Sequence, residues 1–112
     1  MKKSEKKEQQ EKINDIVLNI IDETYQEEFT EYLRIERLRT CQAWVKETPR
    51  FFLLQSYNTI VACIEKDTDT LYDFLRFIYG FTSTSCQHIA KFNHDYSKSQ
   101  HGCKNVYTYR DI

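Results

Sequence analysis

The stretch from Thr40 to Phe74, TCQAWVKETPRFFLLQSYNTIVACIEKDTDTLYDF, decides the fold. Four short runs in it, TCQAWV, FFLL, IVACI and TLYDF, are rich in the β-branched and aromatic residues that favour strands. Polar segments with turn-forming residues separate the runs: KETPR around Pro49, SYNT around Asn58, and KDTD. The pattern predicts an antiparallel β-meander of three or four strands.

The residues before this stretch predict a long helix. From Ile13 to Leu33, apolar side chains recur at intervals of three and four residues, which is the spacing of an amphipathic helix. We expect this helix over about residues 13–35, after a charged and frayed tail over residues 1–12. The tail begins with lysines but no apolar segment follows them, so we expect neither a signal peptide nor a membrane span.

The stretch TSTSCQHIAKFNHDY, from Thr82 to Tyr96, predicts a second and shorter helix. Thr84 is followed three residues later by Gln87, the pattern of a capping box, so we expect the helix to start near Thr84. Three apolar side chains would then share one face of the helix and pack on the sheet: Ile89, Phe92 and Tyr96.

The last segment, NVYTYR at residues 105–110, alternates like a strand. The whole sequence therefore predicts an α+β fold, with a long N-terminal helix, an antiparallel meander of three or four strands, one short capped helix and a C-terminal strand. We expect a single domain over residues 13–112, in which the sheet and the second helix form a unit over about residues 40–112.

The composition limits the classes of function. The chain has 112 residues with 16 Lys and Arg against 17 Asp and Glu, so no overall basic charge favours nonspecific binding of nucleic acid. Without a secretory signal, the four cysteines are expected to be reduced thiols of a cytoplasmic protein.

Two blocks of the sequence carry a resemblance. LLQSYNTIVACI, at Leu53–Ile64, and TSTSCQHIAKF, at Thr82–Phe92, resemble a family of small, largely uncharacterised proteins of phages and mobile elements of Gram-positive bacteria. The SYNT-IVA and TS-x-QHI-x-KF blocks carry the match, which covers roughly residues 37–112 and leaves out the N-terminal helix. The resemblance implies a mobile-element origin and an α+β domain, and it names no catalytic residue.

The cysteines and histidines offer two kinds of chemistry. Cys86 would lie near the start of the second helix, where the helix dipole favours a thiolate. His88 cannot easily serve as its base, because two residues along a helix place side chains on opposite sides. A zinc site is the other alternative, although its ligand spacing is poor; it would use Cys86, His88, His101 and Cys103. We expect ordinary structural residues instead, with no catalytic residue, metal or cofactor.

Acidic residues suggest a binding surface on the N-terminal helix. Glu23, Glu27 and Glu31 follow each other at intervals of four residues, next to Glu28, and would form one acidic stripe. The stripe is either a solvated face or a surface for a basic partner, such as a groove that binds nucleic acid.

Basic residues follow directly. Arg34, Arg37 and Arg39 would either stabilise the C-terminal end of the helix or, with Trp44, contact nucleic acid.

These features predict a binding protein without turnover, in the cytoplasm of a bacterial host. We expect a phage or mobile-element protein that inhibits or modulates a host macromolecule, for example an anti-CRISPR-like inhibitor of a nucleic-acid-binding defence nuclease. The alternatives are a nucleic-acid-binding regulator and a zinc- or cysteine-dependent enzyme. No membrane partner is expected.

Overall fold

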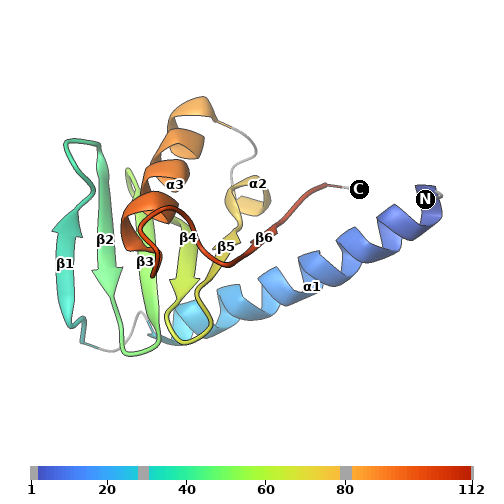
Figure 1. Ribbon diagram of the computed structural model, residues 1–112, viewed down its shortest axis with the longest axis horizontal. Helices are drawn as coiled ribbons and strands as arrows, with labels where there is room; N and C mark the ends of the chain where they lie inside the picture. Colours follow the sequence, from blue (N-terminus) through green and yellow to red (C-terminus); the bar gives the residue numbers. More distant parts are fainter. Residues whose placement is uncertain (1–2, 28–30, 79–81, 112) are drawn as a thin grey trace.

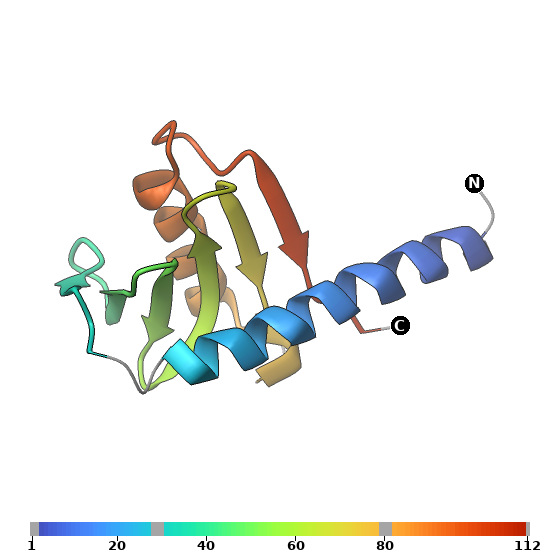
Figure 2. The same ribbon diagram turned by 90° about the horizontal axis from the view of Figure 1, so that it is seen from below.

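A six-stranded sheet forms the middle layer of the protein, with a helix on each face (Figures 1 and 2). The computed structural model describes residues 3–27, 31–78 and 82–111. The elements are α1 (Lys3–Glu27), β1 (Arg34–Arg37), β2 (Ala43–Glu47), β3 (Phe51–Ser56), β4 (Thr59–Glu65), β5 (Thr70–Asp73), α2 (Leu75–Ile78), α3 (Ser83–Tyr96) and β6 (Asn105–Thr108). The α+β fold predicted from the sequence is confirmed.

The strands lie in the sheet in their order along the chain, from β1 at one edge to β6 at the other. The strands β1 to β5 form an antiparallel meander, whereas β6 runs parallel to β5. A parallel neighbour needs a crossover, and α2 and α3 provide it. The predicted meander is therefore present but has one more strand than expected, because β1 was assigned to the helix.

The helix α1 packs on one face of the sheet, the α1 face. Its buried Val17, Ile20 and Ile21 lie against side chains of β3, β4 and β5 such as Phe51, Leu53 and Cys63. The sequence prediction placed its bounds wrongly, since α1 already begins at Lys3 within the supposed frayed tail and ends at Glu27 rather than near residue 35. Contacts of its N-terminal half with the C-terminal segment, described below, explain the early start.

The opposite face, the α3 face, is covered by α3. Ile89 and Phe92 are buried against the sheet and Tyr96 packs beside them, as the sequence predicted. The start of the helix differs from the prediction: the cap is Thr82, whose side-chain oxygen accepts a hydrogen bond from the Ser85 N–H at 3.3 Å. The predicted capping box of Thr84 and Gln87 is therefore wrong.

Candidate functional site

The predicted Cys and His residues do not converge. His88 is buried, with 4% of its surface exposed, and its Nδ1 lies 2.9 Å from the Ser56 hydroxyl. The Ser56 hydroxyl is also 3.0 Å from the Ser85 hydroxyl. Burial lowers the pKa of His88, so the imidazole is neutral at pH 7. This cluster ties α3 to β3 and is part of the packing.

The remaining members of the supposed zinc set lie in other surroundings. The His101 ring packs edge-on against His94, at 5.8 Å between centroids. Burial and the neighbouring Asp69 raise the pKa of Cys103 to about 12. Burial also raises the pKa of Cys86, which contradicts the thiolate expected from its position near the helix start. Within the described residues, no group of three or more His, Cys, Asp or Glu side chains is placed to hold a metal ion.

The acidic residues of the predicted stripe do not all belong to one helix. The helix that would carry it ends at Glu27, so Glu31 lies beyond the helix. Glu23 is half-buried and its carboxylate is 3.3 Å from Arg50. Glu28 and the Glu27 side chain lie outside the described residues. The predicted stripe therefore lacks the helical geometry on which it depended.

The predicted placement of the arginines at the end of the first helix is wrong. Arg34 and Arg37 belong to the strand β1, and Arg39 lies in the turn after it, so none of them lies at the end of α1. The Arg39 guanidinium forms a two-pronged contact with the Asp95 carboxylate of α3, at 2.8 and 2.7 Å. Arg37 donates to the backbone carbonyl oxygens of Cys41 and Thr40. These two arginines therefore already have partners within the chain.

A different surface takes the place of these predictions. On β1 and β2, register and alternation place Ile35, Trp44 and Lys46 on the α1 face. Figure 2 shows that α1 crosses the sheet near β4, β5 and β6 and ends short of β1 and β2. We call the uncovered part the open surface and define it as Tyr25, Tyr32, Ile35, Trp44, Lys46 and Gln55. It combines large apolar side chains with amide and ammonium groups.

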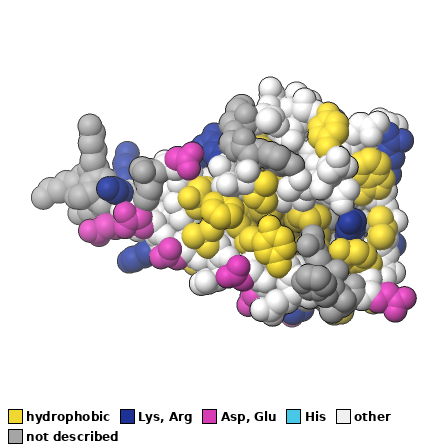
Figure 3. Space-filling model, turned by 180° about the vertical axis from the view of Figure 1, so that it is seen from behind, with side chains coloured by type: hydrophobic (Ala, Val, Ile, Leu, Met, Phe, Trp, Pro, Cys, Tyr) yellow, Lys and Arg dark blue, Asp and Glu magenta, His cyan; other side chains and the backbone are white. Residues whose placement is uncertain are grey.

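The open surface is both exposed and hollowed. Tyr25 and Ile35 are exposed over 52% and 54% of their surfaces. A pocket of about 450 Å³ lies between the end of α1 and the strands, lined in part by Tyr25, Tyr32 and Gln55. Lys46 is the one charged residue among the described residues that line it, and its ammonium lies 5.2 Å from the centroid of the Tyr32 ring. Figure 3 shows this face, with hydrophobic side chains in a band across it and acidic side chains along α1.

At the edge formed by β6, the β6 edge, α1 covers the backbone. Asn105 donates its N–H to Asp69, just before β5, and Tyr109 donates its N–H to Asp73 at the end of β5. The alternation of the strand therefore turns the backbone groups of Thr108 and Arg110 away from the sheet. Side-chain amides of α1 bind these groups. Gln10 donates to the Thr108 carbonyl at 3.0 Å. Asn14 donates to the Arg110 carbonyl at 2.8 Å and accepts from its N–H at 3.1 Å.

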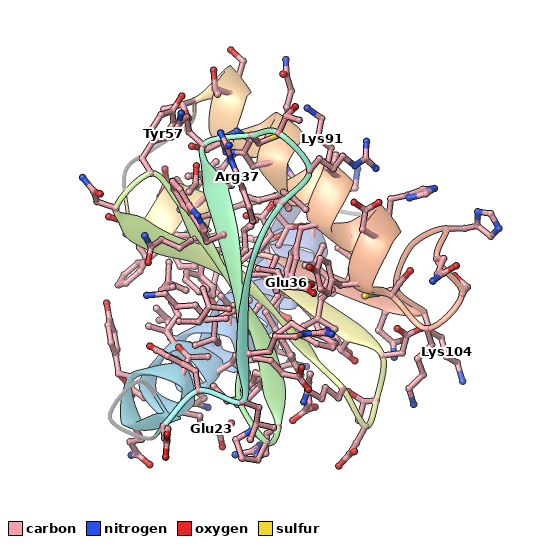
Figure 4. The ribbon with its side chains drawn as sticks, turned by 90° about the vertical axis from the view of Figure 1, so that its left-hand side faces the viewer. Glu23, Glu36, Arg37, Tyr57, Lys91 and Lys104 are labelled. Carbon is pink, nitrogen blue, oxygen red and sulfur yellow. The ribbon has the colours of Figure 1, made fainter. Side chains whose placement is uncertain are left out.

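At the other edge, the β1 edge, no strand of the described chain pairs with the outer side of β1. Figure 4 views the molecule from this side, with Glu36 on the α3 side of β1 and Arg37 near the following turn. Tyr96 donates a hydrogen bond to Glu36 at 2.7 Å, which fixes that side chain on the α3 face. Ile35 belongs both to β1 and to the open surface, so the open surface and the β1 edge adjoin at this residue.

A signal for β1 was present in the sequence. In LRIER, at residues 33–37, apolar Leu33 and Ile35 alternate with charged Arg34 and Glu36, which is the period of a strand and not of a helix.

Comparison of the chain with known protein families, with curated proteins and with solved structures returned no match. Among the described residues, no helix is both long and apolar enough to cross a membrane.

Proposed function

We propose that this chain is a small binding protein that inhibits or modulates a host protein through the open surface. The observation that carries the proposal is that the described residues of α1 cover only part of the α1 face and leave Tyr25, Ile35 and Trp44 beside a pocket at the surface. Tyrosine, tryptophan and other large side chains around a recess supply most of the binding energy in protein interfaces. A contiguous apolar area of this kind is uncommon on a protein without a partner.

A protein partner fits this surface better than nucleic acid does. A nucleic-acid surface needs several unpaired cations to follow the phosphates. Here Arg39 is paired with the Asp95 carboxylate, and Arg34 lies 3.5 Å from the carboxylates of Glu36 and Glu47. Arg37 is bound only to neutral carbonyls and keeps its charge. Acidic side chains border the hydrophobic band on this face (Figure 3). Asp15 and Asp22 of α1 are exposed. Such a border would repel phosphates and would suit a partner with basic residues around an apolar centre.

The resemblance of the sequence to phage and mobile-element proteins makes the proposal more specific. Under this proposal the partner is a component of a bacterial defence system, for example a nuclease whose nucleic-acid groove supplies the basic residues. Binding alone would inhibit such a target, so no turnover is proposed. The buried neutral His88 and the raised pKa of Cys86 support a role without catalysis.

The experiment is affinity capture from a bacterial host, followed by an affinity measurement with the captured protein. The double variant Tyr25→Ala/Lys46→Glu alters the open surface. We expect it to weaken binding by at least about tenfold, because it removes a large contact and reverses the charge in the pocket. The matched control is Val106→Ala/Lys104→Glu, which makes similar changes near the opposite edge, where Val106 is 50% exposed. We expect the control to bind like the wild type.

Three results would contradict the proposal. If the open-surface variant and its control weaken binding equally, or if both bind like the wild type, the open surface is not the binding site. The third is a wild-type protein that retains nucleic acid rather than protein, with an affinity that falls steeply with salt. That result would favour the nucleic-acid-binding regulator.

A further inference from the structure

We infer that the β1 edge pairs with the β1 edge of a second copy of this chain, as antiparallel strands related by a twofold axis at Ile35. The result would be a dimer with one sheet continuous across both copies. The inference rests on the backbone of β1, on the order of charges along it and on the contrast with the β6 edge. It requires no host partner and does not rest on the proposed function, although Ile35 belongs to both the open surface and the β1 edge.

The backbone of β1 has a free side at the required residue. The Leu38 N–H donates to the Ala43 carbonyl at 2.8 Å, and the register pairs Glu36 with Val45. Alternation along an antiparallel pair therefore directs the N–H and C=O of Glu36 toward β2 and those of Ile35 away from it. Two copies of Ile35 placed opposite each other could each donate to the carbonyl of the other. A twofold axis at Ile35 thus matches the outward backbone groups of Ile35, whereas the Leu33 N–H is already bound to the Glu47 carbonyl at 2.9 Å.

The side chains favour the same register. With Ile35 opposite Ile35, Arg34 of one copy lies opposite Glu36 of the other, and both lie on the α3 face. Opposite charges in directly opposed positions stabilise an antiparallel pair. A shift to an axis at Glu36 would oppose like carboxylates and use backbone groups already bound to β2. A shift to an axis between these residues would place Arg34 opposite Arg37. The sequence RIER is therefore self-complementary in one register.

The α1 face gains apolar contact in this arrangement. A twofold axis perpendicular to the sheet keeps the α1 faces of the two copies on the same side. The Ile35 side chains, each 54% exposed, would meet there and join the two open surfaces. The β6 edge is less available for this pairing, because Gln10 and Asn14 of α1 already bind the outward carbonyl of Thr108 and both backbone groups of Arg110.

The experiment measures self-association by analytical ultracentrifugation over a series of concentrations at low salt. Two single variants, Arg34→Glu and Glu36→Arg, each place like charges opposite each other in a homodimer. We expect each to raise the dimer dissociation constant by about tenfold. Mixed in equal amounts, the two variants should associate with each other, because the opposed charges are again complementary. The double variant Arg34→Glu/Glu36→Arg should regain the dimer of the wild type.

A backbone variant tests the same pairing without a change in charge. Ile35→Pro removes an N–H that points out of the sheet, where proline is tolerated, so the fold should survive and the dimer should be lost. Circular dichroism verifies the fold of every variant, and Lys104→Glu serves as the control that keeps the dimer. The inference is overturned if the wild type stays monomeric up to about 1 mM, a concentration at which even a weak specific pair is partly formed. It is also overturned if the mixture of single variants associates no better than each variant alone.

Discussion

The β6 edge and the β1 edge belong to one sheet but are finished in different ways. At the β6 edge, a helix lies along the outermost strand, and its amide side chains bind outward backbone groups of Thr108 and Arg110. At the β1 edge, the helix has ended and the described chain provides no further strand. The difference shows that a helix can close a sheet edge with two polar side chains. It also explains why the surface suited to a partner lies at the end of the sheet that α1 does not reach.

The open β1 edge carries a risk of unwanted association. Exposed strand edges can pair with other chains, and proteins usually keep such strands short or place charged residues on them. The β1 strand is short and carries Arg34, Glu36 and Arg37, which fits such protection. The order of these charges nevertheless allows one antiparallel pairing with itself. The charged residues of β1 therefore disfavour pairing with most other strands and favour pairing with the β1 edge of a second copy.

The largest effect is expected when the closed edge is opened. Asn14 is 7% exposed and makes hydrogen bonds with both backbone groups of Arg110. Asn14→Ala removes these bonds and should lower the free energy of unfolding by about 1–3 kcal/mol, measured by chemical denaturation. Asn19→Ala, on the solvent side of the same helix, is the matched control and should leave the stability within about 0.5 kcal/mol of the wild type. Equal stabilities of the two variants would show that α1 does not close this edge.

A smaller effect is expected at the β1 edge when the pH falls. The turn after β1 is tied to α3 by Arg39 and Asp95, and the bond from Arg39 lowers the pKa of Asp95 to about 2, from an ordinary value of 3.8. Because the folded pKa is the lower one, this contact contributes its full stability above about pH 4 and loses it as the pH falls through about 2. The amide contacts of α1 at the β6 edge do not titrate. The Asp69 carboxylate, which accepts a hydrogen bond from the Lys104 N–H just before β6, also has a lowered pKa. Acid should therefore loosen the turn after β1 and, through Asp69, the segment that leads into β6.

The single tryptophan reports on this change, since Trp44 lies on β2 opposite Arg37. We expect its fluorescence to change between about pH 4 and 2, before the far-ultraviolet circular dichroism does. In Asp95→Asn, which cannot ionise, this early change should be absent. An early change of the same size in Asp95→Asn would assign it to other groups.

The meander was predictable because its signals are local. From β2 to β5, each strand has β-branched and aromatic residues between polar turns, and the structure places strands there. The helix α3 was predictable for the same reason, but its first residue was not. Thr82, Ser83, Thr84 and Ser85 are all plausible caps. In the structure Thr82 is the cap, because its side-chain oxygen accepts a hydrogen bond from the Ser85 N–H. The buried Ser85 is held there by the contact of its hydroxyl with Ser56 on β3, which no local pattern reveals.

The contacts that separate the two edges were not predictable. Gln10 and Asn14 meet Thr108 and Arg110, nearly the whole chain away, so no local pattern marks the early start of α1. The open surface was missed because it depends on where α1 stops above the sheet. Once Arg34 and Arg37 are placed on a strand, their supposed role at a helix end disappears. The sequence contained the alternation of LRIER, but a helical interpretation of the residues before it concealed that signal.

Amide hydrogen exchange measured by NMR at two protein concentrations tests the contrast between the edges most directly. The Arg110 N–H points away from β5 but is bound by Asn14, so it should exchange slowly at both concentrations. The Ile35 N–H should exchange quickly in dilute solution and become protected at high concentration, when the β1 edges pair. Slow exchange of Ile35 in dilute solution, or exchange that does not depend on concentration, would contradict the account of an open edge that pairs with itself.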